Sequence, residues 1–359
     1  MLLAIETSCD DTSVAVVHRG RVLSNIVSSQ RRLHAEYGGV VPELAARAHL
    51  RNFLPVAQAA LREAGASPPE LEAIAATQGP GLPNALLVGF TAGQSIAFAL
   101  RRPFLGIHHH EAHLYSPWIS GDPPAADFTA FQPNVSLVVS GGHTLLVHVY
   151  LEGSPRAAPA DPTARGQDAV VTLHRVLGST LDDAAGECFD KVAKLLGLPY
   201  PGGPELDRLA AEGNPAAYEF PRPLLREATD DFSFAGLKTS VRYFLQKHPD
   251  LLNDPRQVRD LCASVQAAIV EVLVAKTMRA AKRLGVGCVT ASGGVSCNRA
   301  LRRDLAAACR REGLVLRLSE RSLCTDNAAM IGILAERKFQ QAPAPASFDG
   351  EISPRWTLA

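Results

Sequence analysis

The sequence lacks the features that mark secreted and membrane proteins. Its seven cysteines form no CxxC pair, which disfavours a disulfide framework and indicates a reducing compartment. No run approaches the roughly 18 consecutive apolar residues of a membrane span. No basic leader precedes the short apolar run at residues 2–5. We therefore expect a soluble, cytoplasmic protein.

The sequence also lacks net charge, because 36 Lys and Arg residues balance 36 Asp and Glu residues. A protein that holds nucleic acid through its overall electrostatic field is normally basic. Any RNA binding by this chain is therefore expected to use a local patch or the surface of a partner.

Three common catalytic motifs are absent as well. None of the glycine-rich turns fits GxxxxGK[ST] or GxGxxG, which excludes P-loop and Rossmann nucleotide sites. The metallopeptidase motif HExxH needs two residues between its glutamate and its second histidine, whereas only Ala112 separates Glu111 from His113. A peptidase would therefore lack its general base.

What is present is a pattern of strands and helices that occurs twice. In the first half we expect strands at 2–5, 14–17, 22–27 and 73–77, and helices at 42–64 and 83–100. In the second half we expect strands at 135–140, 145–150 and 288–291, and helices at 183–196, 255–284 and 327–339. The pattern predicts a two-domain α/β protein with mixed sheets. It resembles the actin-like ATPase (ASKHA) fold, in which two ribonuclease-H-like domains enclose a nucleotide.

The domain organisation follows from the same pattern. We expect an N-terminal α/β domain over residues 1–125, completed by a C-terminal helix at 325–345, and a C-terminal α/β domain over residues 126–324. Residues 151–180 are rich in Ala, Pro, Asp and Arg and are expected to form a loop or hairpin insertion. The Pro/Ala-rich tail after Gln341 is expected to be loosely held.

A histidine-rich segment, residues 107–113, is the first candidate site. His109 and His113 are four residues apart, so on a helix both imidazoles lie on one face and can bind one ion. Asp326, in a turn before the last expected helix, is a candidate third ligand. Two imidazoles and a carboxylate with open positions suit Fe(II) or Zn(II). The alternatives are a solvated histidine-rich helix start and an N-cap role for Asp326.

Glycine-rich turns are the second candidate site. Turns at 139–143 and 292–298 each follow a buried strand, and a third at 200–204 lies between two helices. Glycines let backbone N–H groups approach a phosphate, and a helix N-terminus adds partial positive charge. Two such turns in matching places of two halves predict a nucleotide site more strongly than one turn does.

Carboxylates in polar loops form the third candidate site. Asp10 and Asp11 follow the first strand, and Asp190 lies in the polar segment 181–191. Asp190 is a candidate acceptor for ribose hydroxyl groups. The alternative is a solvated acidic face beside Lys191 and Lys194.

Nine motifs together resemble one family, the catalytic subunits of threonylcarbamoyladenosine synthase. They are residues 6–10, 78–81, the His109/His113 pair, 139–144, 182–191, 200–204, 232–238, 292–298 and 324–327. They occur in family order over almost the whole chain. The sequence departs from the bacterial pattern at His110, where Met is common, so His110 is a potential competing ligand. Asp11 stands where many relatives have glutamate.

The resemblance implies a reaction. The threonylcarbamoyl group of threonylcarbamoyl-AMP would be transferred to N6 of adenosine 37 in tRNAs that read codons beginning with adenine, with release of AMP. It implies that His109, His113 and Asp326 bind one divalent metal, Fe(2+) in the first place and Zn(2+) in the second. It also implies an adenylate pocket, formed by Val138, Val139, Ser140, Gly141, Gly142, Asp190, Gly203 and Asn298.

Further expectations follow from the same resemblance. The donor is already an activated mixed anhydride, so no Ser or Cys nucleophile is needed, and Asp10 or Asp11 is the expected proton acceptor. A paralogous partner subunit (TsaB-like) and a small ATPase (TsaE-like) are the expected protein partners, alongside tRNA. Two rival functions share the fold: a sugar kinase or Hsp70-like ATPase, and a non-catalytic homologue that only pairs with other subunits.

Overall fold

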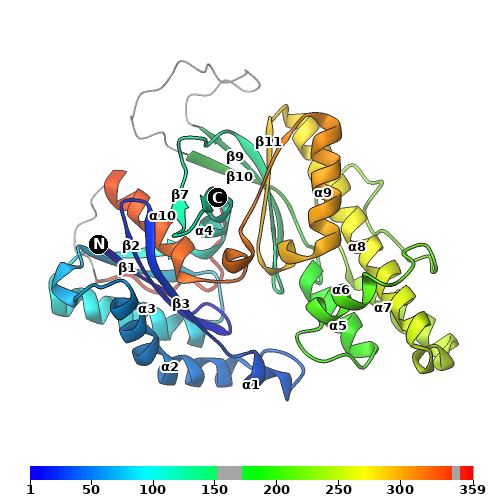
Figure 1. The fold of residues 1–359 in the computed structure, drawn as a ribbon, viewed down its shortest axis with the longest axis horizontal. Helices are drawn as coiled ribbons and strands as arrows, with labels where there is room; N and C mark the ends of the chain where they lie inside the picture. Colours follow the sequence, from blue (N-terminus) through cyan, green and yellow to red (C-terminus); the bar gives the residue numbers. More distant parts are fainter. Residues whose placement is uncertain (152–171, 342–347, 359) are drawn as a thin grey trace. The chain divides into compact units, whose positions relative to one another are not determined.

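The computed structural model describes residues 1–151, 172–341 and 348–358. Its chain divides into two compact units (Figure 1). Unit 1 comprises Met1–Phe131 and Ser319–Leu358, and unit 2 comprises Gln132–Leu318. Each unit is built around its own mixed sheet.

The described residues of unit 1 form a seven-stranded sheet in the order β5-β4-β1-β2-β3-β7-β6. Its strands are β1 (Leu2–Glu6), β2 (Asp11–His18), β3 (Arg21–Ser29), β4 (Ala73–Gly79), β5 (Phe104–His108), β6 (Ile119–Ser120) and β7 (Ala125–Ala126). A tight turn at Arg19 and Gly20, both with positive φ, reverses the chain between β2 and β3, as expected for a two-residue hairpin. Strands β4 and β5 extend the sheet in parallel from β1.

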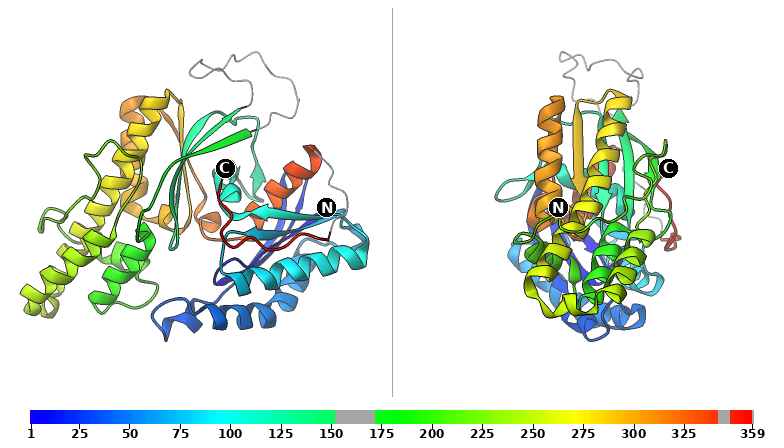
Figure 2. Two further views of the ribbon diagram at one scale, coloured as in Figure 1. Left: turned by 180° about the vertical axis from the view of Figure 1, so that it is seen from behind. Right: turned by 90° about the vertical axis from the view of Figure 1, so that its right-hand side faces the viewer.

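Helices cover both faces of the unit 1 sheet (Figures 1 and 2). On one face α2 (Pro42–Glu63) and α3 (Pro83–Leu100) pack on a core that includes Leu3 and Ile5. On the other face lies α10 (Ala328–Gln341), so close that a Cβ at Gly332 would lie 2.9 Å from a Val17 methyl group. Burial on both faces explains why residues 2–5 of β1 and 14–17 of β2 are continuous apolar runs rather than alternating ones. The shorter helices of this unit are α1 (Arg31–Ala35) and α4 (His109–Tyr115).

Unit 2 repeats this topology. Its sheet has the order β10-β9-β8-β11-β12, in which three antiparallel strands are followed by two parallel ones. The order β3-β2-β1-β4-β5 in unit 1 is the same arrangement. The strands are β8 (Asn134–Val139), β9 (Thr144–Leu151), β10 (Thr172–Ser179), β11 (Cys288–Ser292) and β12 (Val315–Leu318). The repeated pattern expected from the sequence is therefore present.

The helices of unit 2 are α5 (Ala185–Leu195), α6 (Gly202–Ala210), α7 (Ala235–Lys247), α8 (Pro255–Leu284) and α9 (Arg299–Glu312). Helix α8 begins at an Asp254 cap, has Pro255 in its first turn, and ends at left-handed Gly285, which matches the range predicted from the sequence. By length and composition alone, α3 and α8 are apolar enough to cross a membrane. In α8, 72% of the apolar window is buried inside the protein, as expected of a core helix.

The sequence predicts two irregular segments. The predicted insertion at 151–180 lies for the most part outside the described residues, and its last part forms β10. The prediction of a loose tail after Gln341 is wrong for residues 348–358. Ser353 N–H donates to the Gln78 carbonyl over 2.8 Å, Gly81 N–H donates to the Pro354 carbonyl, and Phe348 packs edge-on against Phe98. Backbone hydrogen bonds and an aromatic contact hold residues 348–358 on unit 1.

Candidate functional site

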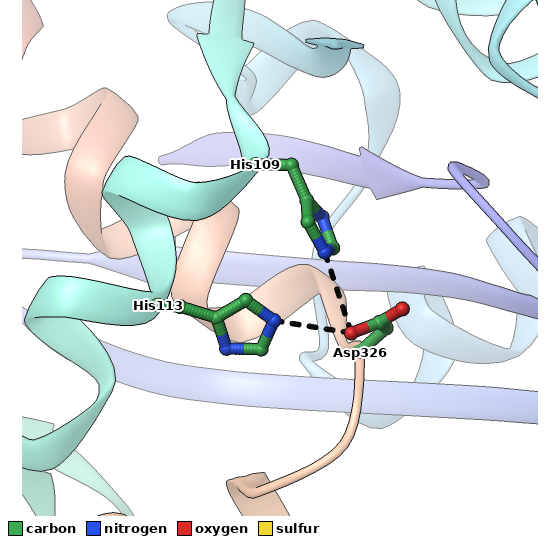
Figure 3. Close-up of side chains that lie close together, drawn as sticks. All are labelled: His109, His113 and Asp326. Atoms are coloured by element: carbon green, nitrogen blue, oxygen red, sulfur yellow. Dashed lines mark hydrogen bonds and ion pairs between the residues drawn. The ribbon is translucent and has the colours of Figure 1, made fainter. Parts of the chain in front are cut away.

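Three side chains of unit 1 converge to form the candidate metal site (Figure 3). His109 and His113 lie one turn apart on α4, which starts directly at the end of β5. Asp326 lies in the loop just before α10. Their donor atoms lie within 4.8 Å of one another, and no other group of this kind occurs in the described ranges. His110, on the same helix, is not part of the cluster.

The distances suit a metal ion. Asp326 Oδ1 lies 3.1 Å from His113 Nε2 and 3.4 Å from His109 Nε2. Ligands about 2.1 Å from a common metal are separated by roughly 3.0 Å in octahedral and 3.4 Å in tetrahedral geometry. Two imidazole nitrogens and one carboxylate oxygen are also the donor set of open Fe(II) and Zn(II) sites. The residues present therefore fit a divalent cation of that class.

The charge balance of the site favours a cation. Burial disfavours a charged His109, but the carboxylates of Asp326 and Glu6 outweigh it and raise the pKa of His109 to about 10. Burial also opposes the charge of Asp326, yet His109 and His113 hold the pKa of that carboxyl well below its usual range. Burial lowers the pKa of His113. A proton on His109 thus supplies the positive charge that the buried Glu6 and the partly buried Asp326 require, and a metal ion would supply it more fully.

Side-chain bonds hold the ligand-bearing segments together. The Ser116 hydroxyl, just after α4, donates to the Leu323 carbonyl over 3.1 Å and meets the Ser319 hydroxyl at 2.9 Å. Lys338 of α10 pairs with Glu111 of α4 at 2.6 Å. Segments about 200 residues apart in sequence are thereby fixed within the distance that one ion can bridge.

The N-cap interpretation of Asp326 is not supported. Asn327, the next residue, has its side-chain oxygen 3.1 Å from Met330 N–H and so caps α10. Asp326 instead directs its carboxylate to the histidines. Because Asn327 fills the cap position, the aspartate is available as a ligand.

The first turn carries the two carboxylates predicted to accept a proton. Asp11 begins β2, is 9% exposed, and has one oxygen, Oδ1, with no hydrogen-bond partner in the described chain. Burial raises the pKa of Asp11 to about 7, with contributions from the charges of Asp10 and Asp326. Asp11 is therefore a carboxyl group with the proton affinity expected of a general base near neutral pH. The Asp10 carbonyl accepts from Gln30 N–H at 3.0 Å.

The neighbouring thiol is unsuited to nucleophilic catalysis. Burial and the charges of Asp10 and Asp326 raise the pKa of Cys9 well above its usual value. A thiol becomes a nucleophile through its thiolate, which this setting disfavours. The expectation that no Cys nucleophile is used agrees with this environment.

The predicted glycine turn of unit 2 joins β8 to β9. Ser140 N–H donates to the His143 carbonyl at 2.8 Å, and Gly186 N–H, at the start of α5, donates to the Ser140 carbonyl at 3.1 Å. A Cβ at Gly186 would lie 2.4 Å from the Ser140 oxygen, so this approach requires glycine. Gly141 and Gly142 are exposed, and a Cβ on either would meet nothing within 4 Å. Val138 and Val139, by contrast, are buried strand residues.

The structure joins some of the other predicted pocket residues directly. The Asp190 carboxylate accepts from Gly203 N–H at 2.9 Å, where α6 begins. Asn298 is 8% exposed, caps α9 through Leu301 N–H at 3.0 Å and donates to Gln266 at 2.7 Å. One side-chain N–H of Asn298 remains for another acceptor, since its amide nitrogen carries two.

Sequence reasoning missed Glu6, which is fully buried at the end of β1. Its carboxylate lies 2.8 Å from His109 Nδ1 and accepts from the Thr77 hydroxyl at 2.6 Å. The available signal was a single carboxylate directly after the apolar run at 2–5. A charge at the end of a buried strand needs a partner, and the partner here is a candidate ligand.

Solved structures of low sequence identity share the fold. Component A of (R)-2-hydroxyglutaryl-CoA dehydratase from Acidaminococcus fermentans matches with a TM-score of 0.51 and 13% identity, covering 94% of this chain and 98% of that one. HypF from T. kodakarensis matches with a TM-score of 0.57 and 16% identity, covering 94% of this chain and 48% of its own length. The predicted actin-like ATPase (ASKHA) fold is confirmed.

Sequence comparison gives the family. Residues 21–160 and 163–333 match the family described as tRNA N6-adenosine threonylcarbamoyltransferase. The protein of that name from Geotalea uraniireducens is 47% identical over 359 residues, covering 100% of this chain and 96% of the relative. The one from Geobacter metallireducens is 50% identical over 334 residues, covering 93% and 90%. The chain therefore belongs to the tRNA N6-adenosine threonylcarbamoyltransferase family, as its motifs predicted.

Proposed function

We propose that this protein transfers the threonylcarbamoyl group of threonylcarbamoyl-AMP to N6 of adenosine 37 in tRNAs that read codons beginning with adenine. The N6 nitrogen forms a bond to the carbamoyl carbon, the bond from that carbon to the phosphate oxygen breaks, and AMP leaves with the electron pair. One proton leaves the nitrogen. The observation that carries the proposal is the convergence of His109, His113 and Asp326 in a chain of this family.

The metal proposed for the site is Fe(2+), with Zn(2+) as the alternative. When bound, a divalent cation supplies Lewis acidity and an open position that orients oxygens and offsets negative charge. The two histidines and Asp326 would hold it with uncharged nitrogens and one carboxylate oxygen. Glu6, buried behind His109, balances further positive charge.

The adenylate is proposed to bind to unit 2. Exposed Gly141 and Gly142 leave space for a phosphate to approach backbone N–H groups, and the N-terminus of α5 is held against the same turn through Gly186. Asp190, with Gly203 N–H on its carboxylate, is proposed to accept from the ribose. Asn298 offers its remaining amide hydrogen, and Val138 and Val139 support the turn from β8.

Asp11 is proposed as the proton acceptor. The N6 nitrogen is a weak nucleophile, and it becomes acidic as the new bond forms, so a base with a pKa near 7 is well matched to the step. Asp11 Oδ1 is buried and has no hydrogen-bond partner among the described residues, so a proton taken from the substrate would satisfy it once substrate binding exposes that oxygen. Asp10, in the same turn, is proposed to add negative charge that keeps the proton affinity of Asp11 high.

Protein partners are proposed from exposed apolar side chains of unit 1 and from the lack of net charge. Leu50 and Leu54, one turn apart on α2, are 68% and 62% exposed, and Leu87 on α3 is 51% exposed. Only 33% of the apolar window of α3 is buried, which is low for so apolar a helix. A paralogous (TsaB-like) subunit is proposed to cover these residues in the cytoplasm. A small (TsaE-like) ATPase and the partner's surface would supplement tRNA binding by a chain without net charge.

The test is reconstitution. Threonine, bicarbonate, ATP, an adenylate-forming enzyme, the partner proteins and a substrate tRNA are combined with this chain, and nucleosides are analysed by mass spectrometry. We expect modified adenosine 37 and AMP, and severe loss of both with Asp326→Ala. A kinase would release ADP when given a sugar, and a regulatory homologue would be indifferent to the substitution. Absence of modified adenosine with all components active would overturn the proposal.

A further inference from the structure

The two histidines of the candidate metal site differ in what lies behind them. His109 Nδ1 lies 2.8 Å from the Glu6 carboxylate, with the Ser8 hydroxyl at 3.3 Å as a more distant neighbour. His113 Nδ1 is buried and has no hydrogen-bond partner among the described residues. Both rings direct Nε2 to the same oxygen of Asp326 (Figure 3). Only one ring is therefore oriented from behind by an anion.

Glu6 is held so that it cannot turn away from His109. It is fully buried at the end of β1, and its Oε2 accepts from the hydroxyl of Thr77 on the adjacent parallel strand β4 at 2.6 Å. Its other oxygen accepts from Ser8 N–H. Both carboxylate oxygens are thus engaged, and the histidine meets a fixed acceptor.

We propose that Glu6 is a positioning residue for the metal. Its carboxylate accepts the Nδ1–H of His109, which fixes the tautomer whose Nε2 lone pair points to the ion and makes that nitrogen a stronger donor. His109 is then the dominant histidine ligand and His113 the weaker one. The inference rests on the proposed metal site and adds a residue that touches neither metal nor substrate.

The substitution that separates positioning from simple packing is Glu6→Gln. Glutamine keeps the shape and one acceptor oxygen, and the Thr77 hydroxyl can rotate to accept from its amide, so the strand contact survives. The negative charge behind His109 is lost. Loss of such an outer partner typically weakens metal binding about 10- to 100-fold.

The matched control is Glu336→Gln. Glu336 belongs to unit 1, and its carboxylate also accepts backbone N–H groups, from Arg19 at 2.6 Å and Gly20 at 2.5 Å. Within the described residues it forms no bond to the metal-site residues. The same chemical change at this position should leave the metal affinity unaltered.

The experiment measures Zn(2+) dissociation constants by competition with a chromogenic chelator, together with the visible spectrum of the Co(2+)-loaded protein. We expect Glu6→Gln to raise the dissociation constant about 10- to 100-fold and to shift the Co(2+) bands. Glu336→Gln should match the unsubstituted protein in both. A Glu6→Gln protein with unchanged affinity and spectrum would overturn the inference.

A second measurement needs no variant. Nitrogen-15 spectra of the histidine rings in the Zn(2+)-loaded protein report which nitrogen bears the proton. His109 should show a protonated Nδ1 in a strong hydrogen bond, and metal on Nδ1 would contradict the inference.

His109→Ala distinguishes failure of the proposed metal site from failure of the proposed role of Glu6. If it retains stoichiometric metal, the site assignment itself fails; if it loses metal while Glu6→Gln binds normally, only the role of Glu6 fails.

Discussion

The two units share one sheet topology, and the connection after the first strand of each shows how differently that topology is used. In unit 1 the connection from β1 to β2 carries Cys9 and Asp10 and leads into Asp11. In unit 2 the equivalent connection from β8 to β9 carries the exposed pair Gly141 and Gly142. The connection in unit 1 lies among charged side chains, whereas the connection in unit 2 exposes the backbone of two glycines.

The difference corresponds to a division of chemistry. Buried carboxylates and imidazoles are costly to desolvate and are retained where a cation or a proton must be held. Open glycine turns hold little charge of their own and suit an anionic phosphate. The proposed function assigns the metal and the proton to unit 1 and the adenylate to unit 2. Substitutions in one unit should therefore change different quantities from those in the other.

The largest expected effect is loss of the metal from unit 1. His109→Ala and His113→Ala each leave two protein ligands, and we expect both metal content and turnover to fall to background. Metal analysis by mass spectrometry and the reconstituted assay give the result. Titration of adenosine, which lacks the phosphate and acyl oxygens that the metal would orient, serves as the control for unit 2 and should be unchanged. Full metal occupancy in both variants would contradict the assignment of the metal site to these histidines of unit 1.

The next largest effect concerns Asp11. Replacing a general base commonly costs about 10²- to 10⁴-fold in rate, so Asp11→Asn should retain metal and lose turnover within that range. The reconstituted assay at saturating metal measures it. Retention of full activity would exclude Asp11 as the proton acceptor.

Asp11 should also affect stability. Asp11→Asn is expected to lower turnover but to raise the free energy of unfolding above pH 7. Its pKa is raised from 3.8 to about 7 by burial, so between these values the unfolded chain is ionised while the folded chain holds a proton. Stability contributed by the protonated carboxyl is therefore present at low pH and is lost as pH rises through about 7. In the metal-free protein Asp11→Asn should be more stable than the parent at pH 8, by up to about 4 kcal/mol, and the difference should shrink toward pH 4. Urea unfolding at both pH values tests this.

A smaller effect is expected from the open turn of unit 2. Gly141→Ala adds a methyl group where the protein offers no contact within 4 Å, so the fold should be little changed. A phosphate approaching the backbone would meet that methyl group, and we expect adenylate affinity to fall about tenfold. Gly236→Ala is the control, since its Cβ also meets nothing within 4 Å elsewhere in unit 2. Equal adenylate binding by both variants would argue against the turn as the phosphate site. Metal content should be normal in each.

Much of this arrangement could be predicted from the sequence. The limits of α8 follow from Asp254, Pro255 and Gly285, and the His109/His113 spacing places both rings on one face of a helix. Such signals are local, so they survive without knowledge of tertiary contacts.

What could not be predicted depends on contacts between distant segments. The partnership of Glu6 with His109 joins residues 103 apart in sequence, and no periodicity reports it. That Asn327 rather than Asp326 caps α10 depends on the distant histidines, toward which the Asp326 carboxylate is directed. The composition of the tail predicted a loose terminus. The prediction failed because the backbone partners of the tail, such as Gln78, lie far away in the chain and leave no local signal.

The smallest expected effect concerns that tail and only unit 1. The Trp356 ring lies 4.7 Å from the ring of His108, the residue that caps α4 and precedes His109. Trp356 is only partly buried, so Trp356→Ala should lower the free energy of unfolding by about 1 kcal/mol. Because the cap of α4 would then be less constrained, Zn(2+) affinity should weaken by only a few-fold, less than with Glu6→Gln. Chelator competition and urea unfolding measure the two effects. If Trp356→Ala changed adenylate binding to unit 2 but not metal affinity, the proposed link between the tail and the metal site of unit 1 would be wrong.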